Sequence, residues 1–386
     1  DVLQGYPQNI VTFPFSGIMM PPWFAEGVAQ YMSPDVDYDC WDAHRDMILR
    51  SAVLEDNMLT YDQMGFFGKR GLQSEQVYDH GYGLVSYIAS AYGPEAIREI
   101  TQGLKTIYHL NMNGALKAGT GKTGKELYKE WRAHLQTRYN AQTESIRENE
   151  LAGEVVASGG YMTVGPALSP DGQKVAYLSN AGSDYSGTAL FIKPLGEKRA
   201  KALQGGVSSP PQFSRDGQTL VYSKKDKVDR YGSTLNDLYA YDIDRKKEKR
   251  LTKASRAAHP DFSPDGGQIV AVVNSDGTHR MVLMDSDGKN QRVLFERTRG
   301  TQIYYPHFSP DGQRILFGIF EGATRDLAVV SADGSGFTYV LQTQNDERDA
   351  RWLSDNRIVF ASDRTGIFNI YELDLDTGWV AQRSNV

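Results

Sequence analysis

A four-residue motif that recurs at nearly even spacing constrains the fold of this chain more than any other feature. Ser-Pro-Asp-Gly stands at Ser169–Gly172, Ser263–Gly266 and Ser309–Gly312, Ser-Arg-Asp-Gly stands at Ser214–Gly217, and a degenerate copy begins at Ser354. The starting positions are 45, 49, 46 and 45 residues apart. A period of about 40–50 residues with four short strands per repeat is typical of the blades of a β-propeller.

The residues around each motif support this interpretation. Proline presets φ in the Pro-Asp-Gly turn, and glycine takes the positive-φ position. A buried or alternating strand follows each turn, and a second turn rich in Asp and Gly closes the next hairpin. We expect second strands at 174–178, 219–223, 268–273, 314–317 and 357–361, and third strands at 189–193, 237–242, 281–285, 326–331 and 369–373. The sequence therefore predicts five four-stranded units within residues 151–386.

Residues 1–150 have a helical period instead. Apolar side chains recur three and four positions apart, and Pro94 suits the first turn of a helix because its missing N–H would have no partner there. We expect helices over residues 23–31, 76–92, 94–105 and 125–150. The chain is thus predicted to be a two-domain, α plus all-β protein, with a helical domain at 1–150 and a propeller at 151–386.

Composition excludes several function classes. Forty-two Lys and Arg against 48 Asp and Glu give a net charge of −6, so the basic surface typical of nucleic-acid binding is not expected. The single cysteine, Cys40, rules out an intrachain disulfide and a zinc site built from cysteines. No run of about 18 apolar residues occurs, so no transmembrane helix is expected in the sequence.

The repeats also resemble a known family. The Ser-Pro-Asp-Gly turn, followed by a strand of the type Leu/Ile-Tyr-x-Leu/Tyr-Asp, resembles the TolB-type propeller repeat over residues 161–386. Such propellers usually have six blades, so the resemblance implies that a sixth could exist in a longer chain. It also implies binding of proteins or peptides, and an exported protein of a Gram-negative bacterium.

A second resemblance concerns the helical domain. Glu26 lies between Phe24 and Val28 on the apolar face of a predicted helix, where a carboxylate needs a partner. The segment Trp23–Ala29 resembles the Trp-Phe-x-Glu-Gly-x-Ala motif of gluzincin metallopeptidases of the peptidase MA-like type, and Tyr78–Gly81 resembles their Tyr-x-x-Gly helix. The resemblance implies that Glu26 is the third zinc ligand and that Tyr78 stabilises the oxyanion.

The sequence departs from this family at the zinc-binding motif. No His-Glu-x-x-His occurs, and catalytic zinc needs three protein ligands. In related sequences the second histidine is commonly followed by a tripeptide similar to Val-Leu-Gln, so the resemblance implies that Asp1, which precedes Val2-Leu3-Gln4, stands in the position of that histidine. Two alternatives remain open: a degenerate domain that has lost zinc, or an active zinc peptidase whose histidines lie upstream of Asp1.

The remaining histidines have simpler interpretations. His80 is interpreted as a histidine on the helix surface, or as one that contacts a metal-binding side chain without binding the metal itself. His259 and His307 precede two of the Ser-Pro-Asp-Gly turns at equivalent points, which favours repeated packing over catalysis.

Three other motifs lack the residues that their chemistry requires. Gly121-Lys122-Thr123 has Leu116 where a phosphate loop needs glycine, so Gly114–Thr123 is predicted to be a loop before the last helix. Asp285–Gly288 and Asp374–Gly378 resemble calcium loops but fit hairpin turns better. Prolyl-oligopeptidases carry a similar propeller, but their Gly-x-Ser-x-Gly nucleophile motif does not occur here.

Together these observations predict an extracytoplasmic protein-binding or assembly module, periplasmic or associated with the outer membrane, with protein or peptide partners in a cell-envelope complex. No nucleic-acid partner and no certain cofactor are expected. The alternative is an active zinc metallopeptidase whose propeller controls the access of substrates.

Overall fold

The chain divides into two compact units, Asp1–Asn149 and Glu150–Val386. A computed structural model describes residues 20–33, 41–67, 72–104, 112–183, 187–225, 227–228, 230–322 and 324–386. Asp1, the residue in the predicted histidine slot, lies outside these ranges. The helical unit has one large hydrophobic core, whereas the propeller unit has several smaller ones.

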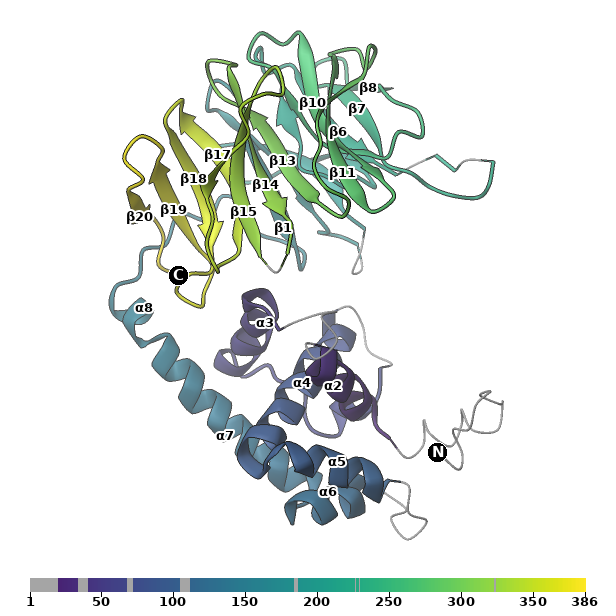
Figure 1. The fold of residues 1–386 in the computed structure, drawn as a ribbon, viewed down its shortest axis with the longest axis vertical. Helices are drawn as coiled ribbons and strands as arrows, with labels where there is room; N and C mark the ends of the chain where they lie inside the picture. Colours follow the sequence, from purple (N-terminus) through teal and green to yellow (C-terminus); the bar gives the residue numbers. More distant parts are fainter. Residues whose placement is uncertain are drawn as a thin grey trace. The chain divides into compact units, whose positions relative to one another are not determined.

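The described part of the first unit is helical (Figure 1). Its elements are α2 (Pro22–Met32), α3 (Ala43–Leu54), the 3₁₀ helix η2 (Gln63–Gly65), α4 (Leu72–Tyr92), α5 (Pro94–Gly103), α6 (Met112–Thr120), α7 (Gly124–Gln142) and α8 (Glu144–Glu148). The predicted helices at 23–31, 76–92 and 94–105 correspond to α2, α4 and α5. The predicted last helix is divided at Thr143 into α7 and α8.

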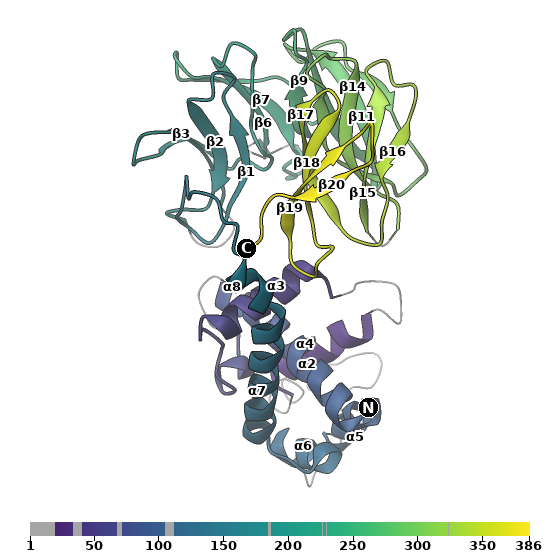
Figure 2. The same ribbon diagram turned by 90° about the vertical axis from the view of Figure 1, so that its left-hand side faces the viewer.

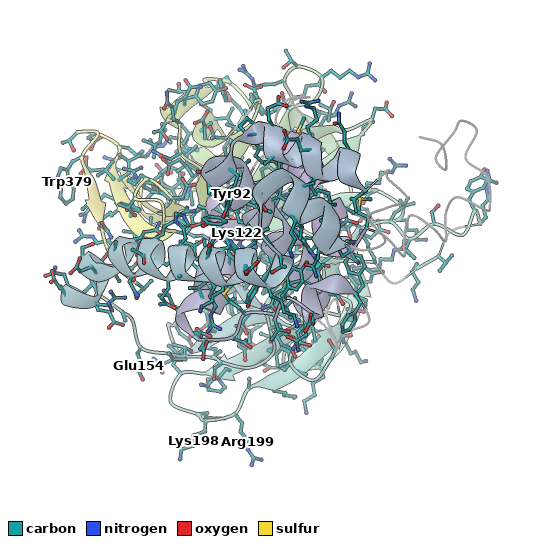
Figure 3. The ribbon with its side chains drawn as sticks, turned by 90° about the horizontal axis from the view of Figure 1, so that it is seen from below. Tyr92, Lys122, Glu154, Lys198, Arg199 and Trp379 are labelled. Carbon is teal, nitrogen blue, oxygen red and sulfur yellow. The ribbon has the colours of Figure 1, made fainter. Side chains whose placement is uncertain are left out.

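One prediction in this unit was wrong. Most of Gly114–Thr123 is not a loop but helix α6, because Ala115 and Leu116 are fully buried and fix one face of this segment in the core. The Gly-Lys-Thr sequence that follows has local structural roles. Thr123 caps α7 by accepting from the backbone N–H of Glu126, while the side chain of Lys122 forms an ion pair with Glu130 beside Tyr92 (Figure 3).

Helices α2 and α4 cross at two glycines. A Cβ atom added to Gly27 would lie 2.3 Å from the carbonyl oxygen of Gly81, and one added to Gly81 would lie 2.3 Å from the carbonyl oxygen of Trp23. No side chain fits in this space, so the two backbones are in direct contact. The crossing also fixes which side chains of the two helices become neighbours.

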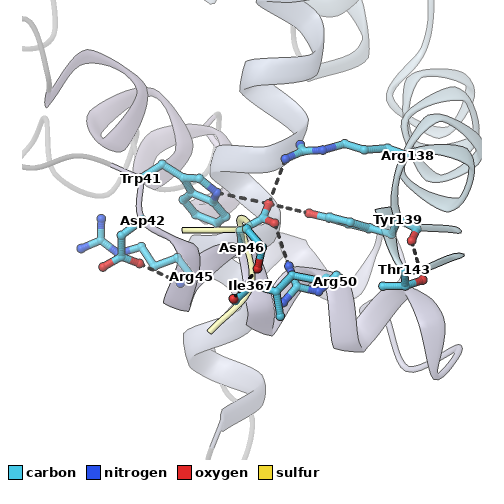
Figure 4. Close-up of polar contacts among 10 residues, drawn as sticks. Trp41, Asp42, Arg45, Asp46, Arg50, Arg138, Tyr139, Thr143 and Ile367 are labelled. Carbon is cyan, nitrogen blue, oxygen red and sulfur yellow. Dashed lines mark hydrogen bonds and ion pairs between the residues drawn. The ribbon is translucent and has the colours of Figure 1, made fainter. Parts of the chain in front are cut away.

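A buried carboxylate connects α3 to α7. Asp46 accepts from the hydroxyl of Tyr139 at 2.8 Å and from Arg50 and Arg138 at 3.2 Å each (Figure 4). Its residue is only 6% exposed, so the two guanidinium groups supply the charge compensation that a buried carboxylate needs.

The second unit is a propeller of five four-stranded antiparallel sheets, as the repeats predicted (Figures 1 and 2). Within each sheet the strands follow chain order. The blades are β1 (Thr163–Leu168), β2 (Lys174–Ser179), β3 (Ala189–Pro194) and β4 (Lys201–Gly205); β5 (Gln212–Phe213), β6 (Thr219–Lys224), β7 (Asp237–Asp242) and β8 (Lys247–Arg250); β9 (Ala257–Phe262), β10 (Gln268–Ser275), β11 (Thr278–Asp285) and β12 (Arg292–Phe295); β13 (Gln302–Phe308), β14 (Arg314–Phe320), β15 (Arg325–Ser331) and β16 (Thr338–Leu341); and β17 (Glu347–Ser354), β18 (Arg357–Ser362), β19 (Asn369–Asp374) and β20 (Val380–Gln382).

The repeat motif closes the hairpin between the first two strands of a blade. Ser309 donates to Asp311 at 2.5 Å and accepts from the backbone N–H of Arg314 at 2.9 Å, while Gly312 adopts a φ of +72°. Ser169, Ser214 and Ser263 form the same contacts in their own blades. The serine hydroxyl and a backbone N–H hold the pKa of Asp311 below its ordinary value. In these four blades the motif is therefore a structural turn that sets the end of the first strand.

Apolar clusters join each blade to the next. Separate clusters link the first blade to the second, the second to the third, the third to the fourth and the fourth to the fifth. Because each blade's second and third strands contribute to these clusters, the blades are fixed against one another by packed side chains.

None of the helices in the described ranges combines the length and the apolar character that crossing a membrane requires.

The glycine crossing can be tested with Gly27→Ala. The added methyl group would force α2 and α4 apart, and we expect the helical unit to lose about 1–3 kcal/mol of unfolding free energy. Urea unfolding followed by circular dichroism at 222 nm, where helices dominate the signal, measures this loss. Gly65→Ala is the matched control, because no atom lies within 4 Å of its added Cβ. Equal stability of the two variants would contradict close backbone contact.

Candidate functional site

The first strands of the blades form the inner edge of the propeller. Contacts run from β1 to β5, from β5 to β9, from β9 to β13 and from β13 to β17. The pairing of β1, β9, β13 and β17 with the second strand of the blade is interrupted by a bulge. A bulge bends the strand and redirects a side chain. Residues at these bulges therefore have a common position in successive blades.

Three adjacent bulges hold a non-glycine residue in the left-handed region. The φ angles are +52° at His259, +50° at Tyr305 and +55° at Asp349, whereas the first blade has Gly165 at +61°. Only glycine adopts such angles without steric cost; for other residues the cost is about 1–3 kcal/mol each. The third, fourth and fifth blades thus bear a strain that the first avoids.

His259 and Tyr305 are in direct contact. Their ring centroids lie 4.2 Å apart in an edge-to-face arrangement. Nδ1 of His259 is buried and has no hydrogen-bond partner within the described residues. Burial, with the nearby His279, His307 and arginine side chains, lowers the pKa of His259 to about 3, so its ring is neutral at physiological pH. A neutral imidazole with an unpaired buried nitrogen is an incomplete hydrogen-bonding group.

A polar chain joins the same three blades two residues further along. Nδ1 of His307 lies 3.4 Å from Oδ2 of Asp261 in the blade before, and Nε2 of His307 contacts Nη1 of Arg351 in the blade after. The indole N–H of Trp352 donates to the backbone carbonyl of His307 at 3.0 Å. Because Arg351 can only donate, Nε2 of His307 is the acceptor and its proton lies on Nδ1, facing Asp261.

This chain gives Arg351 a fixed position. Nη1 contacts His307 and donates to the carbonyl of Ala350 at 3.2 Å. Its Nε and Nη2 groups make no hydrogen bond to the described part of the chain. Burial has the largest effect and lowers the pKa of Arg351, while the charges of Asp261 and Asp349 oppose this shift. One edge of a bidentate donor is therefore open to a ligand.

Aromatic and cationic groups extend the cluster. The guanidinium of Arg325 lies 4.2 Å from the centroid of the Tyr304 ring, within the range of a cation–π interaction. His279 packs edge-on against Tyr304, and its Nδ1 accepts from the backbone N–H of Ile303 at 3.0 Å. We define the inner-strand cluster as His259, Asp261, Tyr304, Tyr305, His307, Arg325, Asp349 and Arg351.

Sequence analysis anticipated only part of this cluster. His307 is 6% exposed and serves a packed polar network, in line with the packing interpretation. His259 differs, because its ring carries an unpaired nitrogen next to a half-exposed Tyr305. The signal that could have revealed the site is the pair of residues four and two positions before a repeat serine, as at Ser263 and Ser309. In the fifth blade the extra residue Leu353 places the corresponding pair, Asp349 and Arg351, five and three positions before Ser354, and Arg351 was missed for this reason.

Glu26 and Tyr78 lie on the two helices that cross at the glycines. Both are half-buried, and the ring of Tyr78 packs 5.3 Å from Phe67. Burial raises the pKa of Tyr78, and the nearby carboxylates of Glu26 and Glu75 raise it further. The two residues named by the peptidase resemblance are thus close enough to interact electrostatically.

His80 points into the core and was wrongly interpreted as a helix-surface residue. It is fully buried, its ring packs edge-on to Trp131, and its Nε2 accepts from the backbone N–H of Leu59 at 3.3 Å. Burial lowers its pKa to about 4. Across the ranges that the structure describes, no three His, Cys, Asp or Glu side chains form a group that could hold a metal ion. The described residues therefore do not fit a zinc site, and Glu26 alone cannot supply one.

Asp79 is a buried carboxyl group on the same helix. It is 6% exposed, and burial raises its pKa to about 7; Arg45 opposes this shift, while Glu75 and Asp42 add to it. The folded chain therefore keeps a proton on Asp79 that the unfolded chain releases near pH 4.

This difference predicts a pH-dependent effect of Asp79→Asn. The stability associated with protonated Asp79 is fully present below the unfolded pKa and is lost as the pH rises to about 7. Asparagine stays neutral, so the variant should gain about 1.4 kcal/mol per pH unit over this window relative to wild type. Urea unfolding at pH 4.5 and pH 8, followed at 222 nm, tests this, with the exposed Asp62→Asn as control. An equal gain at both pH values would show that Asp79 is not protonated in the folded state.

Comparisons with known proteins concern the propeller. A family model described as "TolB beta propeller domain" (PD40) matches residues 139–354. Dipeptidyl-peptidase 5 of Aspergillus fumigatus is 24% identical over 225 residues, which are 52% of this chain and 29% of that protein. The chain thus spans less than a third of the length of this relative.

Two solved structures are also similar. TolB from Acinetobacter baumannii is 17% identical with a TM-score of 0.49, over 57% of this chain and 53% of that one. A putative TolB from Agrobacterium tumefaciens is 20% identical with a TM-score of 0.49, over 60% of this chain and 83% of that one. The peptidase MA-like resemblance of the helical unit stays a prediction, since the family match begins at residue 139. Because the family match covers more than half of the chain, the protein belongs to the TolB beta propeller family.

Proposed function

We propose that this protein is an extracytoplasmic protein-binding or assembly module, whose propeller receives a segment of a partner protein at the inner-strand cluster. The observation that carries the proposal is the set of three strained residues, His259, Tyr305 and Asp349, at equivalent bulges of adjacent blades. Backbone strain of this kind persists where the surrounding structure imposes it, and it concentrates at ligand-binding sites.

The chemistry of the cluster supports a protein ligand. Tyrosine and arginine are enriched at the centres of protein interfaces, and the cluster presents Tyr304, Tyr305, Arg325 and Arg351. Tyr304 and Arg325 are stacked on each other, so their side chains lose little freedom when a partner binds. The packed apolar interfaces between blades hold the strands that carry the cluster in fixed positions.

We place the protein in the periplasm or at the outer membrane of a Gram-negative cell, and its partners in a cell-envelope complex. This part of the proposal rests on the resemblance of the repeats to TolB propellers.

For the helical unit we propose a degenerate peptidase MA-like domain that serves as a recognition surface. Glu26 and Tyr78 would be remnants of a substrate cleft, and their proximity supports this assignment. The alternative, an active zinc peptidase, requires two histidines upstream of Asp1, with Glu26 as third ligand and Tyr78 as oxyanion donor.

Protein binding at the inner strands can be tested by photo-crosslinking. Benzoylphenylalanine placed at Tyr304 keeps an aromatic ring there, and on irradiation in the periplasm of a Gram-negative host we expect a discrete adduct with a partner protein. Tyr231 is the control position, since it is an exposed tyrosine outside the cluster. Absence of an adduct at Tyr304, or the same adducts at both positions, would contradict the proposal.

The two accounts of the helical unit can be separated by metal analysis of the full-length natural protein. A degenerate domain predicts less than one zinc per ten chains by mass spectrometry, roughly a background level, and no peptide cleavage in wild type or Glu26→Gln, because a zinc site needs three ligands. Stoichiometric zinc, with cleavage abolished by Glu26→Gln, would establish the peptidase instead.

A further inference from the structure

The inner-strand cluster contains donors that its own acceptors do not satisfy. Nε and Nη2 of Arg351 are open, and the buried Nδ1 of the neighbouring His259 has no partner in the described ranges. A polar group without a hydrogen bond is destabilising, so a ligand that accepts from the open groups of Arg351 is favoured. The cluster is thus incomplete by itself.

The type of the open groups indicates the kind of ligand. Asp261 already accepts from the backbone N–H of Phe308 at 3.0 Å and faces Nδ1 of His307. Asp261 and Asp349 both act electrostatically on Arg351, and together they balance the formal charges of Arg325 and Arg351. The open groups of Arg351 are hydrogen-bond donors on a cation, so they favour an acceptor, and most of all one that is negatively charged.

The geometry of the open guanidinium edge favours a carboxylate over other anions. The Nε–Nη2 edge of a guanidinium is a planar, two-donor fork that matches the two oxygens of a carboxylate. Arg351 cannot rotate freely to meet other shapes, because its Nη1 group contacts His307, which Asp261 holds in turn. Tyr305 lies close enough to Arg351 to interact with it electrostatically, and its ring offers apolar surface that suits the rest of a peptide.

We propose that the open edge of Arg351, beside His259, binds a carboxylate of a protein partner, so that the propeller recognises an acidic peptide segment. This inference rests on the proposed protein-binding function and adds the chemical class of the ligand. In it Arg351 contacts the ligand, whereas Asp261 and His307 are positioning residues.

A carboxylate can come from an acidic side chain or from a chain terminus, and three peptides separate these sources. Acetyl-Gly-Glu-Gly-amide offers only the side chain, acetyl-Gly-Gly-Gly with a free carboxylate offers only the terminus, and acetyl-Gly-Gln-Gly-amide offers neither. We expect one or both acidic peptides to bind in isothermal titration calorimetry, and the glutamine peptide to bind at least tenfold more weakly. Equal binding of all three would overturn the proposal.

Variants then assign the binding to Arg351. Arg351→Gln should weaken the binding of the acidic peptide at least tenfold, since a charge-assisted bidentate pair of hydrogen bonds is lost. Arg280→Gln is the control, because Arg280 is an exposed arginine of β11 that pairs with Glu296 outside the cluster. Unchanged affinity in a folded Arg351→Gln variant would overturn the proposal.

A measurement on the wild-type protein keeps the test valid if Arg351→Gln does not fold. In ¹⁵N-histidine spectra, with the His259 signals identified by their loss in His259→Gln, the acidic peptide should shift the Nδ1 resonance of His259, and the glutamine peptide should not. No shift with either acidic peptide would contradict the site. If neither acidic peptide binds but the Tyr304 adduct with a partner protein forms, only the inference of a carboxylate ligand is wrong. If the acidic peptides bind through Arg351 but no adduct forms, the proposed protein-binding function is wrong.

Discussion

In the first four blades of the propeller, the hydroxyl group of the repeat serine determines where the first strand ends. In the fourth blade, Ser309 binds both Asp311 and the backbone of Arg314, and it is fully buried. These bonds fix the turn and, through it, the register of the first hairpin. The bulge lies four residues earlier, at Tyr305, so the turn indirectly sets the residue that faces the inner edge.

The same combination of turn and bulge recurs in neighbouring blades, and it brings together residues that are far apart in sequence. His259, Tyr305 and Asp349 are about one repeat apart in sequence, yet each occupies the same point of its blade. The chain from Asp261 through His307 to Arg351 crosses two blade boundaries. Its members differ in chemistry at an equivalent position, which identical packing would not require. A structural repeat thus provides three adjacent positions, and side-chain identity makes them a candidate site.

The helical unit uses a different constraint, the absence of side chains. Gly27 and Gly81 let two helix backbones meet, and this contact places Glu26 and Tyr78 near each other. The glycine in the Trp-Phe-x-Glu-Gly-x-Ala resemblance therefore has a packing role here, whether or not any metal chemistry exists. Burial of His80 and Asp79 on the same helix shows that neighbouring polar residues serve the core instead.

The sequence alone determined the architecture, because it depends on local rules that can be read from neighbouring residues. The Ser-Pro-Asp-Gly spacing indicated five blades, and helical periodicity indicated α2, α4 and α5. It failed for α6, whose helical state depends on burial of Ala115 and Leu116 by distant residues.

Only the tertiary structure decided which polar groups are satisfied. Sequence analysis treated His259 and His307 as equivalent, which was wrong: His259 lies at a bulge, at the position of Tyr305, whereas His307 lies two residues further along. Arg351, 44 residues from His307 in sequence, contacts the ring of His307, while Nδ1 of His259 has no partner among the described residues. Such partnerships depend on how blades stack in space. Local sequence patterns do not predict these partnerships, because hydrogen bonds between blades join residues that no turn or sequence period connects.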